Sequence, residues 1–332
     1  MTRHTALRPV RWQPPRPDDR ARRRRGDRDF RLTVIRLPGT GSEDVLVDAD
    51  SHVLTAVDDG RILRVSPDGH RIATVADTGG RGLGLELHPA GGLVVCDARR
   101  GLLRVWPDEQ HPEQARVEVL VPGLRFCNNA AVAADGTIYF TDSSRHFGQP
   151  EYKGDLLEHA GTGRLLRHSP DGAVETLADG LHFPNGVALA ADESFLLFAQ
   201  TGSYSLDRLW LTGPRQGELE PFVQNLPGFP DNLARGSDGL FWVGLPAARN
   251  RMLDLLAPRH PALRKLAWAL PDALLPREGR TVFAQAFDAD GRLVHDLQQP
   301  GTELYMCSGV REHDGMLWLG SLTCPAIGRV VL

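Results

Sequence analysis

Oxygen-bearing side chains recur at one position of a repeated phrase in this sequence. The phrase is a turn rich in Asp and Gly followed by an apolar strand, and its six copies have their turns at Asp50, Ala90, Asp135, Asp192, Asp238 and Asp314. Seven residues before these turns stand Glu43, Leu83, Asn128, Asn185, Asp231 and Cys307. Two carboxylates and two amide carbonyls suit a hard divalent cation, above all Ca²⁺, and lack the imidazoles or thiolates that zinc favours. The pattern predicts a cation site if the six copies converge in space.

The spacing of the copies predicts the fold that makes them converge. Successive turns are 40, 45, 57, 46 and 76 residues apart. Repeats of about 40 to 50 residues, each containing several short strands, are typical of propeller blades. The innermost strand of every blade lines the central channel, so equivalent positions meet there. We therefore expect an all-β, six-bladed β-propeller whose channel holds a cation on Glu43, Asn128, Asn185 and Asp231.

The residue that follows Glu43, and the residue at the equivalent position of the other copies, is also polar in several blades. These residues are Asp44, Gly84, Asn129, Gly186, Asn232 and Ser308. Asp44, Asn129 and Asn232 either hold a second, structural ion or form a polar network. For Glu43, Asn128, Asn185 and Asp231 the alternative to a cation site is that these side chains close the channel by hydrogen-bonding to one another. Two converging carboxylates would repel each other without a cation, which favours the cation site.

Two segments depart from the repeat. Residues 1–37 are basic and rich in Pro and Arg, so we expect a flexible leader before a propeller at 38–332. The longest interval contains residues 247–279, where Leu263, Leu266, Leu270 and Leu274 recur at helical spacing. We expect a helical insertion between the fifth and sixth blades that covers the propeller face or mediates a homo-oligomer.

Composition limits the setting in which this protein works. No apolar run reaches the roughly 18 residues of a membrane span, and the N-terminus lacks the apolar core of a secretory signal. The four cysteines form no CxxC pair, so reduced thiols are expected. The run Arg22–Arg25 is interpreted as part of a solvated leader, not as a nucleic-acid site. We expect a cytoplasmic protein with a small-molecule substrate, no membrane span and no nucleic-acid partner.

Several longer motifs carry a family resemblance. They are GSED at Gly41, FCNNAAVAADGTIYFTDSS at Phe126, FPNGVAL at Phe183, PGFPDNLARGSDGLFWVG at Pro227 and EHDGMLWLGS at Glu312. From about Pro38 to Leu332 the chain resembles the strictosidine synthase-like branch of the calcium-dependent phosphotriesterase superfamily. That superfamily includes gluconolactonases (senescence marker proteins) and paraoxonases. The resemblance implies that Glu43, Asn128, Asn185 and Asp231 bind a catalytic divalent cation, usually calcium.

The chain departs from two branches of that superfamily. Alkaloid-forming strictosidine synthases use a Glu in the last blade where this chain aligns Ser308. Paraoxonase-type lactonases carry a His where this chain has Leu83. Gluconolactonase-type members lack that His, and their metal-ligating Asp is the base or nucleophile. The resemblance therefore implies the gluconolactonase-type arrangement, with Asp231 in that role.

The expected function is metal-dependent hydrolysis of a lactone or other ester. A cation, Ca²⁺ or another divalent ion, would polarise the carbonyl. Asp231 would act as base or nucleophile, and His182 would shuttle protons. The expected substrate pocket comprises Leu83, Phe126, His146, Phe183, Cys307 and Ser308. The alternatives are a bond-forming biosynthetic enzyme of the Pictet–Spengler or cyclase type, and a non-catalytic binding propeller.

Overall fold

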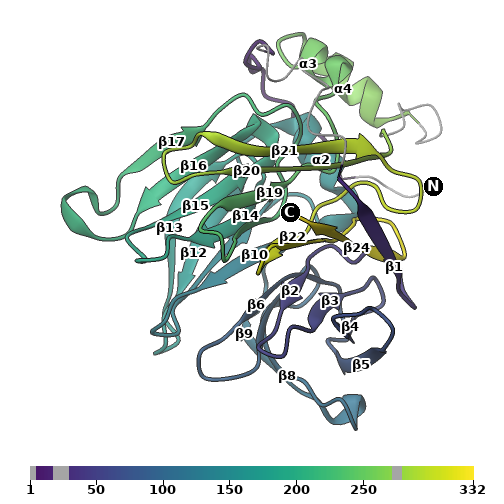
Figure 1. Cartoon of the computed structure of the whole chain (residues 1–332). Coiled ribbons are helices and arrows are strands. Elements are labelled where there is room, and N and C mark those ends of the chain that lie inside the picture. Colours follow the sequence, from purple (N-terminus) through teal and green to yellow (C-terminus); the bar gives the residue numbers. More distant parts are fainter. Residues whose placement is uncertain (1–4, 18–29, 271–278) are drawn as a thin grey trace.

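The structure is a computed structural model that describes residues 5–17, 30–270 and 279–332. In these ranges 24 strands form six four-stranded antiparallel sheets, so the six-bladed all-β propeller is confirmed. In Figure 1 the first strands of the blades, such as β2, β6, β10 and β14, gather near the centre of the view. The outer strands β5, β13 and β17 lie at its periphery.

The blades follow one another along the chain. Blades one and two comprise β2 (Leu46–Val47), β3 (Val53–Ala56), β4 (Arg61–Val65), β5 (Ile72–Asp77), then β6 (Gly82–Leu87), β7 (Leu93–Asp97), β8 (Gly101–Trp106), β9 (Arg116–Val121). Blades three and four comprise β10 (Cys127–Val132), β11 (Ile138–Asp142), β12 (Gly163–His168), β13 (Val174–Leu181), then β14 (Pro184–Leu189), β15 (Phe195–Gln200), β16 (Ser205–Trp210), β17 (Leu219–Val223). Blades five and six comprise β18 (Leu233–Arg235), β19 (Phe241–Gly244), β20 (Thr281–Phe287), β21 (Leu293–Pro300), then β22 (Val310–His313), β23 (Met316–Leu319), β24 (Ala326–Val331), β1 (Leu32–Arg36).

The last blade is completed by a strand from the beginning of the chain. β1 pairs antiparallel with β24, from Leu32 opposite Val330 to Arg36 opposite Ala326. The propeller therefore begins before residue 38, the boundary expected from the sequence. The repeat pattern missed the stretch LTVIR because this strand lies before the first copy, far in the sequence from its partner β24. Of the expected leader, Arg22–Arg25 lie outside the residues that the structure describes.

The helices interrupt blades three and five. α2 (Tyr152–Glu158) lies between β11 and β12, and α3 (Arg251–Leu256) and α4 (Pro261–Trp268) lie between β19 and β20. Short 3-10 helices occur at Pro112–Gln114, Gln149–Glu151, Thr201–Ser203 and Gly213–Arg215. The expected insertion is thus found inside the fifth blade instead of between the fifth and sixth blades. The error arose because β20 and β21, which follow the insertion, were not recognised in the sequence as the outer strands of blade five.

The N-terminal segment 5–17 packs on these helices instead of forming a free leader. Val10 donates its amide to the Glu158 carbonyl at 2.8 Å. The fully buried Arg264 of α4 donates to the carbonyls of Val10 at 2.7 Å and Leu157 at 2.8 Å. In Figure 1 this purple segment lies beside α3 and α4. The segment therefore links α2 to α4 across one side of the propeller.

The apolar stripe expected on the insertion faces outward. Leu263, Leu266 and Leu270 are 41%, 64% and 40% exposed, while Arg264 is buried. Leu274 lies outside the described residues. The homo-oligomer through this insertion stays a prediction. Among the described residues no helix is long and apolar enough to cross a membrane.

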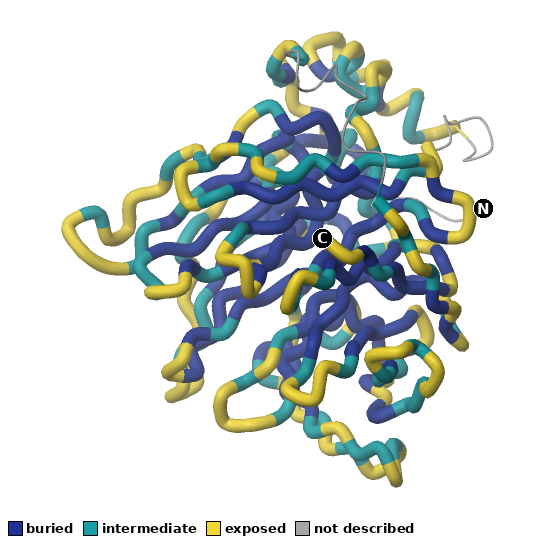
Figure 2. Tube along the Cα trace, viewed as in Figure 1, coloured by how far each residue is buried: buried dark blue, intermediate teal, exposed yellow. Residues whose placement is uncertain are grey.

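The core lies between neighbouring blades. Figure 2 shows the buried chain concentrated in the strands around the centre and the exposed chain in the outer loops. One apolar cluster joins blades four and five through Leu197, Leu206 and Val243. The four cysteines are free and buried, as expected.

Candidate metal centre

The four predicted cation ligands lie at the same end of their blades. Asn128 and Asn185 are the second residues of β10 and β14, while Glu43 and Asp231 lie three and two residues before the first residues of β2 and β18. All four are at least 94% buried. We call Glu43, Asn128, Asn185 and Asp231 the cation ring. The negative charge of Glu43 acts on Asp231 and contributes to raising its pKa.

Three oxygens of this ring have no hydrogen-bond partner in the described part of the chain. They are Oδ1 of Asn128, Oδ1 of Asn185 and Oδ1 of Asp231, and all are buried. A buried acceptor left without a partner costs about 1–3 kcal/mol. Three such oxygens on converging residues match the hard-oxygen ligands that Ca²⁺ prefers. The donor set therefore fits a divalent cation.

The two ring amides are oriented by hydroxyl groups that the sequence analysis missed. Asn128 donates its Nδ2 to Ser143 Oγ at 2.8 Å, and Asn185 donates to Thr201 Oγ1 at 3.3 Å. Both amide oxygens are thereby left free. Ser143 and Thr201 are each the first residue after the second strand of their blade. That shared position is the sequence signal that identifies them.

The same hydroxyls connect neighbouring blades. Ser143 Oγ donates to the carbonyl of Pro184 at 2.6 Å, and Thr201 Oγ1 donates to that of Pro230 at 2.6 Å. Pro184 and Pro230 directly precede the ring residues Asn185 and Asp231. Each hydroxyl thus fixes one ring amide and the backbone beside the next ring residue.

Burial controls the charge of the ring carboxyls. Burial raises the pKa of Glu43 to about 7, against the opposing effect of Arg81. Arg81 Nη2 lies 3.3 Å from Glu43 Oε2 and Arg81 Nε lies 3.0 Å from Asp58 Oδ1. Burial, and then the charge of Glu43, raises the pKa of Asp231 well above its usual range. A bound cation would therefore compete with protons for both carboxyls.

One step deeper in the channel, Asp44, Asn129 and Asn232 form a connected network. Asn129 Nδ2 lies 3.3 Å from Asp44 Oδ2 and 3.1 Å from Asn232 Oδ1. Asn232 Nδ2 donates to the Glu43 carbonyl at 3.0 Å, and Asp44 Oδ2 accepts the Leu85 amide at 3.0 Å. Burial raises the pKa of Asp44 to about 6. Because these groups bond to one another, the geometry favours a polar network, which we call the inner layer, over a second ion.

The register of blade six is one residue different from the one expected. In blade five the Gly244 amide donates to the Asn232 carbonyl at 3.1 Å. In blade six the Gly320 amide donates to the Gly309 carbonyl at 2.9 Å. Gly309 is therefore equivalent to Asn232. It follows that the preceding residue, Ser308, is equivalent to the ring residue Asp231.

Cys307 consequently lies outside the pocket, contrary to the sequence expectation. It packs with Trp242 and Cys324 in the apolar core of the last two blades. The physical reason is turn length. β22 and β23 are joined by Asp314 and Gly315 alone, whereas residues 133–137 join the first two strands of blade three. Counting back from the turn therefore misplaces the ring position of blade six.

Ser308 is buried and its hydroxyl is used within the protein. Ser308 Oγ donates to the Glu43 carbonyl at 2.7 Å. The neighbouring Gly309 packs directly on Asp44, because a Cβ at Gly309 would lie 2.7 Å from the Asp44 Cα. Blade six thus closes against blade one at the cation ring.

An apolar wall stands beside the ring. Leu83, Phe126 and Phe183 form one cluster, in which the two phenyl rings meet edge to face at 5.3 Å. Phe126 and Phe183 each precede a ring amide by two residues. Tyr152 and Leu156 of α2 pack on the same cluster. The structure thus brings three predicted pocket residues together and adds a helix that the sequence analysis did not place.

His182 belongs to a stack of three rings. It lies parallel to His159 at 3.9 Å, and His159 lies on Trp12 at 3.9 Å. Burial lowers the pKa of both histidines, that of His159 to about 2. The stack ties segment 5–17 to the residues before Asn185, and burial disfavours the protonated form of His182 by lowering its pKa.

His146, the other predicted pocket histidine, pairs with an acid on α2. Its Nδ1 lies 2.7 Å from Glu158 Oε1, and its side chain is 30% exposed. Its imidazole also contacts the ring of Phe147. His146 therefore positions α2, and a contact with substrate stays a prediction.

The buried position of His159 in this stack predicts how the stability of the protein depends on pH. The pKa of His159 is about 6.5 in the unfolded chain and about 2 in the folded protein. Protonation below pH 6.5 therefore favours the unfolded chain, so the free energy of unfolding is greatest above pH 6.5 and decreases as the pH falls. Between pH 7 and 5 this amounts to about 2 kcal/mol. In His159→Phe the loss of unfolding free energy between about pH 7 and pH 5, measured by urea denaturation, should be smaller by that amount.

The left-handed backbone of residue 159 (φ 52°) adds a cost for Phe that is independent of pH. The slope, and not the absolute midpoint, is therefore the readout. His313→Gln, at a histidine whose side chain is 42% exposed, is the control. Equal slopes in wild type and His159→Phe would show that His159 is not held neutral by the stack.

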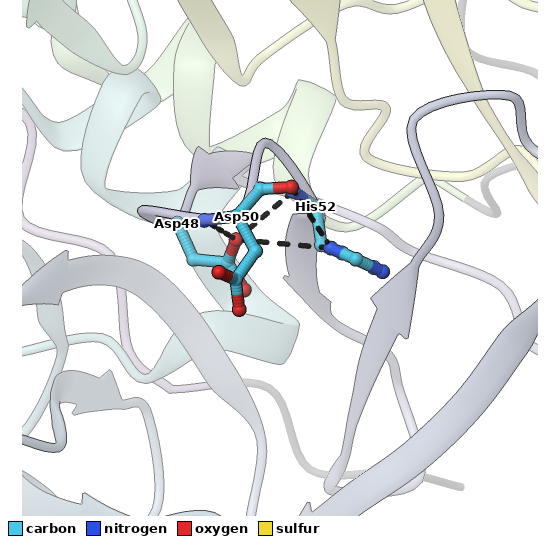
Figure 3. Close-up of side chains that lie close together, drawn as sticks. All are labelled: Asp48, Asp50 and His52. Atoms are coloured by element: carbon cyan, nitrogen blue, oxygen red, sulfur yellow. Dashed lines mark hydrogen bonds and ion pairs between the residues drawn. The ribbon is translucent and has the colours of Figure 1, made fainter.

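A second acidic group lies on the outer surface. Figure 3 shows Asp48, Asp50 and His52 around the turn that joins β2 and β3. Asp48 Oδ1 accepts the amides of Asp50 and His52, both at 2.9 Å. Arg64 pairs with both aspartates at 2.8 Å. Turn geometry and Arg64 therefore account for this group without a metal ion.

Comparison with known proteins places the chain in a family. The model of the strictosidine synthase family matches residues 128–214, and that of the strictosidine synthase-like N-terminal region matches residues 31–65. The adipocyte plasma membrane-associated protein of Danio rerio is 33% identical over 325 residues, which cover 91% of this chain and 77% of that protein. The chain belongs to the strictosidine synthase-like family. The cytoplasmic location expected from the sequence stays a prediction, because this relative is named for a membrane.

Other strictosidine synthase-like and more distant proteins share the architecture. The Arabidopsis thaliana protein strictosidine synthase-like 13 is 35% identical over 226 residues, covering 66% of this chain and 56% of that protein. A Xanthomonas campestris gluconolactonase superposes with a TM-score of 0.64 at 23% identity, over 100% of this chain and 99% of its own. The calcium-binding protein regucalcin from Agrobacterium tumefaciens has a TM-score of 0.61 at 12% identity, over 91% and 95%. These two structures show the fold.

Proposed function

We propose that this chain is a metal-dependent hydrolase of a lactone or other ester. The cation ring would hold a divalent ion, with Ca²⁺ preferred because its ligands would all be oxygens. The observation that carries the proposal is a set of three buried oxygens, on Asn128, Asn185 and Asp231, that have no hydrogen-bond partner among the described residues. When bound, the cation would polarise the substrate carbonyl and stabilise negative charge on its oxygen.

Asp231 is the residue assigned to attack or to proton removal. Its backbone is fixed on both sides, since its amide donates to the Gly244 carbonyl at 2.9 Å and its carbonyl accepts the Gly186 amide at 3.1 Å. A carboxylate bound to a cation through both oxygens is a weak base, so Asp231 would bind the ion through one oxygen. The other oxygen would then remove a proton from a water molecule that attacks the ester carbonyl.

The other residues position the substrate and exclude water. Ser143 and Thr201 accept hydrogen bonds from the side-chain nitrogens of Asn128 and Asn185. The side-chain oxygens of these two asparagines would therefore remain available to the cation. Leu83, Phe126 and Phe183 offer an apolar surface to the acyl part of a substrate. His182 would take part as a neutral imidazole, since burial lowers its pKa.

Hydrolysis is favoured over bond formation by the residue at the blade-six ring position. That position, where alkaloid-forming strictosidine synthases use a Glu, carries Ser308 here, and its hydroxyl is committed to the Glu43 carbonyl. Ser308 thus offers no carboxylate for amine chemistry. The gluconolactonase with the same propeller supports ester hydrolysis as the reaction class.

Metal removal tests the proposal directly. The purified protein is expected to contain about one equivalent of calcium by elemental analysis. Hydrolysis of a panel of small lactones and aryl esters should fall to background in chelator and return when Ca²⁺ is added. Mg²⁺, Mn²⁺ and Zn²⁺ are compared in the same assay, because oxygen-ligand sites accept several cations.

Two other results would contradict the hydrolase. Bound metal without turnover of any ester would favour a binding propeller in which the ion braces the channel. Absence of metal, with the fold intact, would show that the ring is a hydrogen-bonded plug and would raise the bond-forming alternative.

A further inference from the structure

The helices that interrupt blade five carry exposed apolar side chains. Leu255 of α3 is 55% exposed, and Met252 lies one turn before it on the same helix. Leu263 and Leu266 lie one turn apart on α4, and Leu270 follows shortly after that helix ends. We call Met252, Leu255, Leu263, Leu266 and Leu270 the helical face. Figure 2 shows the exposed chain of this region at one side of the molecule. Exposed apolar side chains gathered in this way are typical of an interaction surface.

Specific contacts on its other side turn the leucines of α4 outward. The buried Arg264 donates hydrogen bonds to the carbonyls of Leu157 and Val10. One turn later, Trp268 donates its indole Nε1 to the Thr5 carbonyl at 3.1 Å. A helix on a protein surface usually buries its leucines and exposes its arginines. Because α4 does the opposite, its leucines are available to a partner outside the chain.

The same region is strongly basic. Segment 5–17 and residues 249–270 together contain eight basic residues and one acidic residue, whereas the whole chain has 38 Lys and Arg against 42 Asp and Glu. The acidic residue, Asp254, pairs with Arg249 at 3.0 Å. Arg249 also donates to the Pro15 carbonyl at 2.7 Å, which places the two segments side by side. Six cations are exposed and form no ion pair within the described part of the chain, namely Arg8, Arg11, Arg16, Arg251, Arg259 and Lys265.

We propose that the helical face and these six cations form a docking surface for an anionic lipid bilayer. The leucines would enter the boundary between the lipid head groups and the acyl chains. The cations would lie among the lipid phosphates, where each contributes to binding. Because no helix of the described chain is long and apolar enough to cross a bilayer, α3 and α4 would lie in the plane of the interface.

Charge and shape favour a bilayer over a protein as the occupant of this surface. In a two-fold contact between two copies of this chain the surface would meet itself, so the cations of one copy would face those of the other. In Figure 1 α3 and α4 project from one side of the propeller. A partner protein would have to offer a groove that matches these helices, whereas a fluid bilayer accepts projecting leucines without a matching cavity.

Vesicle cosedimentation of the full chain tests this docking surface. The protein should bind vesicles made of equal parts of phosphatidylcholine and phosphatidylglycerol. It should bind vesicles of phosphatidylcholine alone at least about tenfold more weakly, and high salt should weaken binding to the anionic vesicles.

Two pairs of substitutions test the leucines and the cations separately. Leu255→Gln combined with Leu266→Gln should weaken binding to anionic vesicles about tenfold, because apolar area no longer enters the bilayer. Arg259→Gln combined with Lys265→Gln should weaken it by a similar factor, about tenfold. Thermal unfolding should be unchanged in both variants, because all four side chains are exposed and Gln is a good helix former.

Leu219→Gln is the matched control for the leucine variant. Leu219 lies on β17, away from the helices, and is 47% exposed. This control should bind vesicles as wild type does. The proposal is overturned if the full chain binds neither kind of vesicle, or if it binds both equally well. It is also overturned if the full chain is a dimer in sedimentation velocity that Leu255→Gln with Leu266→Gln dissociates, since a second copy would then occupy the helical face.

Discussion

Replacing Asp231 with Asn is expected to abolish ester hydrolysis while the propeller remains folded. The substitution keeps the shape of the side chain and one carbonyl oxygen, but it removes the group that would accept a proton or attack the substrate. Loss of a positioned general base lowers kcat by about 10²–10⁴. Stability should be preserved because burial disfavours the charged form of Asp231, whose pKa is raised.

Asp207→Asn is the matched control for this substitution. Asp207 is also a buried aspartate whose pKa is raised by burial, but it lies on β16 and bonds with Gln200. The control should hydrolyse esters at the wild-type rate. Calcium content is measured for both variants, so that loss of the ion is separated from loss of the base. Unchanged turnover in Asp231→Asn with calcium bound would remove Asp231 from the mechanism.

The cation ring was predictable because it depends on periodicity. Blades one, three, four and five have similar distances between the ring position and the following turn, so Glu43, Asn128, Asn185 and Asp231 share one register in the sequence. The six-bladed fold follows from the same spacing. These features need only the alternation of strand and turn, which each blade encodes locally.

Features that depend on contacts between blades were not predictable in the same way. The short turn at Asp314 and Gly315 shifted the register of blade six, so Cys307 was expected where Ser308 lies. With the corrected register, the position after the ring alternates between polar residues and glycine, as Asp44, Gly84, Asn129, Gly186, Asn232 and Gly309. A Cβ at Gly84 would lie 2.6 Å from the Asn129 Cα, so each glycine admits the polar residue of the next blade.

The N-terminal part of the chain shows the same limit. β1 looks like any short apolar strand in the sequence, and only its pairing with β24 reveals that it closes the ring of blades. Likewise most hydrogen bonds of segment 5–17 use its own backbone groups, as where the Val10 amide donates to Glu158 and the Val10 carbonyl accepts from Arg264. Such contacts leave little trace in residue composition. Proline and arginine enrichment was therefore interpreted as flexibility.

Removal of residues 1–37 is expected to prevent stable folding of the propeller. Ile35 and Leu37 are both only 7% exposed, and burial of each contributes about 1.5–3 kcal/mol. The pairing of β1 with β24 adds backbone hydrogen bonds worth about 1 kcal/mol each. Together these losses approach the whole stability of a typical domain, about 5–15 kcal/mol. Without β1 the edge of β24 is also left unpaired, which favours aggregation.

A chain that begins at residue 30 is the comparison that isolates β1. It lacks segment 5–17 but retains the strand, so it should unfold cooperatively in urea, at a lower midpoint than the full chain because α2 and α4 lose their contacts with Val10. The chain that begins at residue 38 should show no cooperative transition. A cooperative transition of equal midpoint in both shortened chains would mean that blade six is stable with three strands. Closure by β1 matters for chemistry as well, because blade six supplies Ser308, which bonds to the backbone of Glu43.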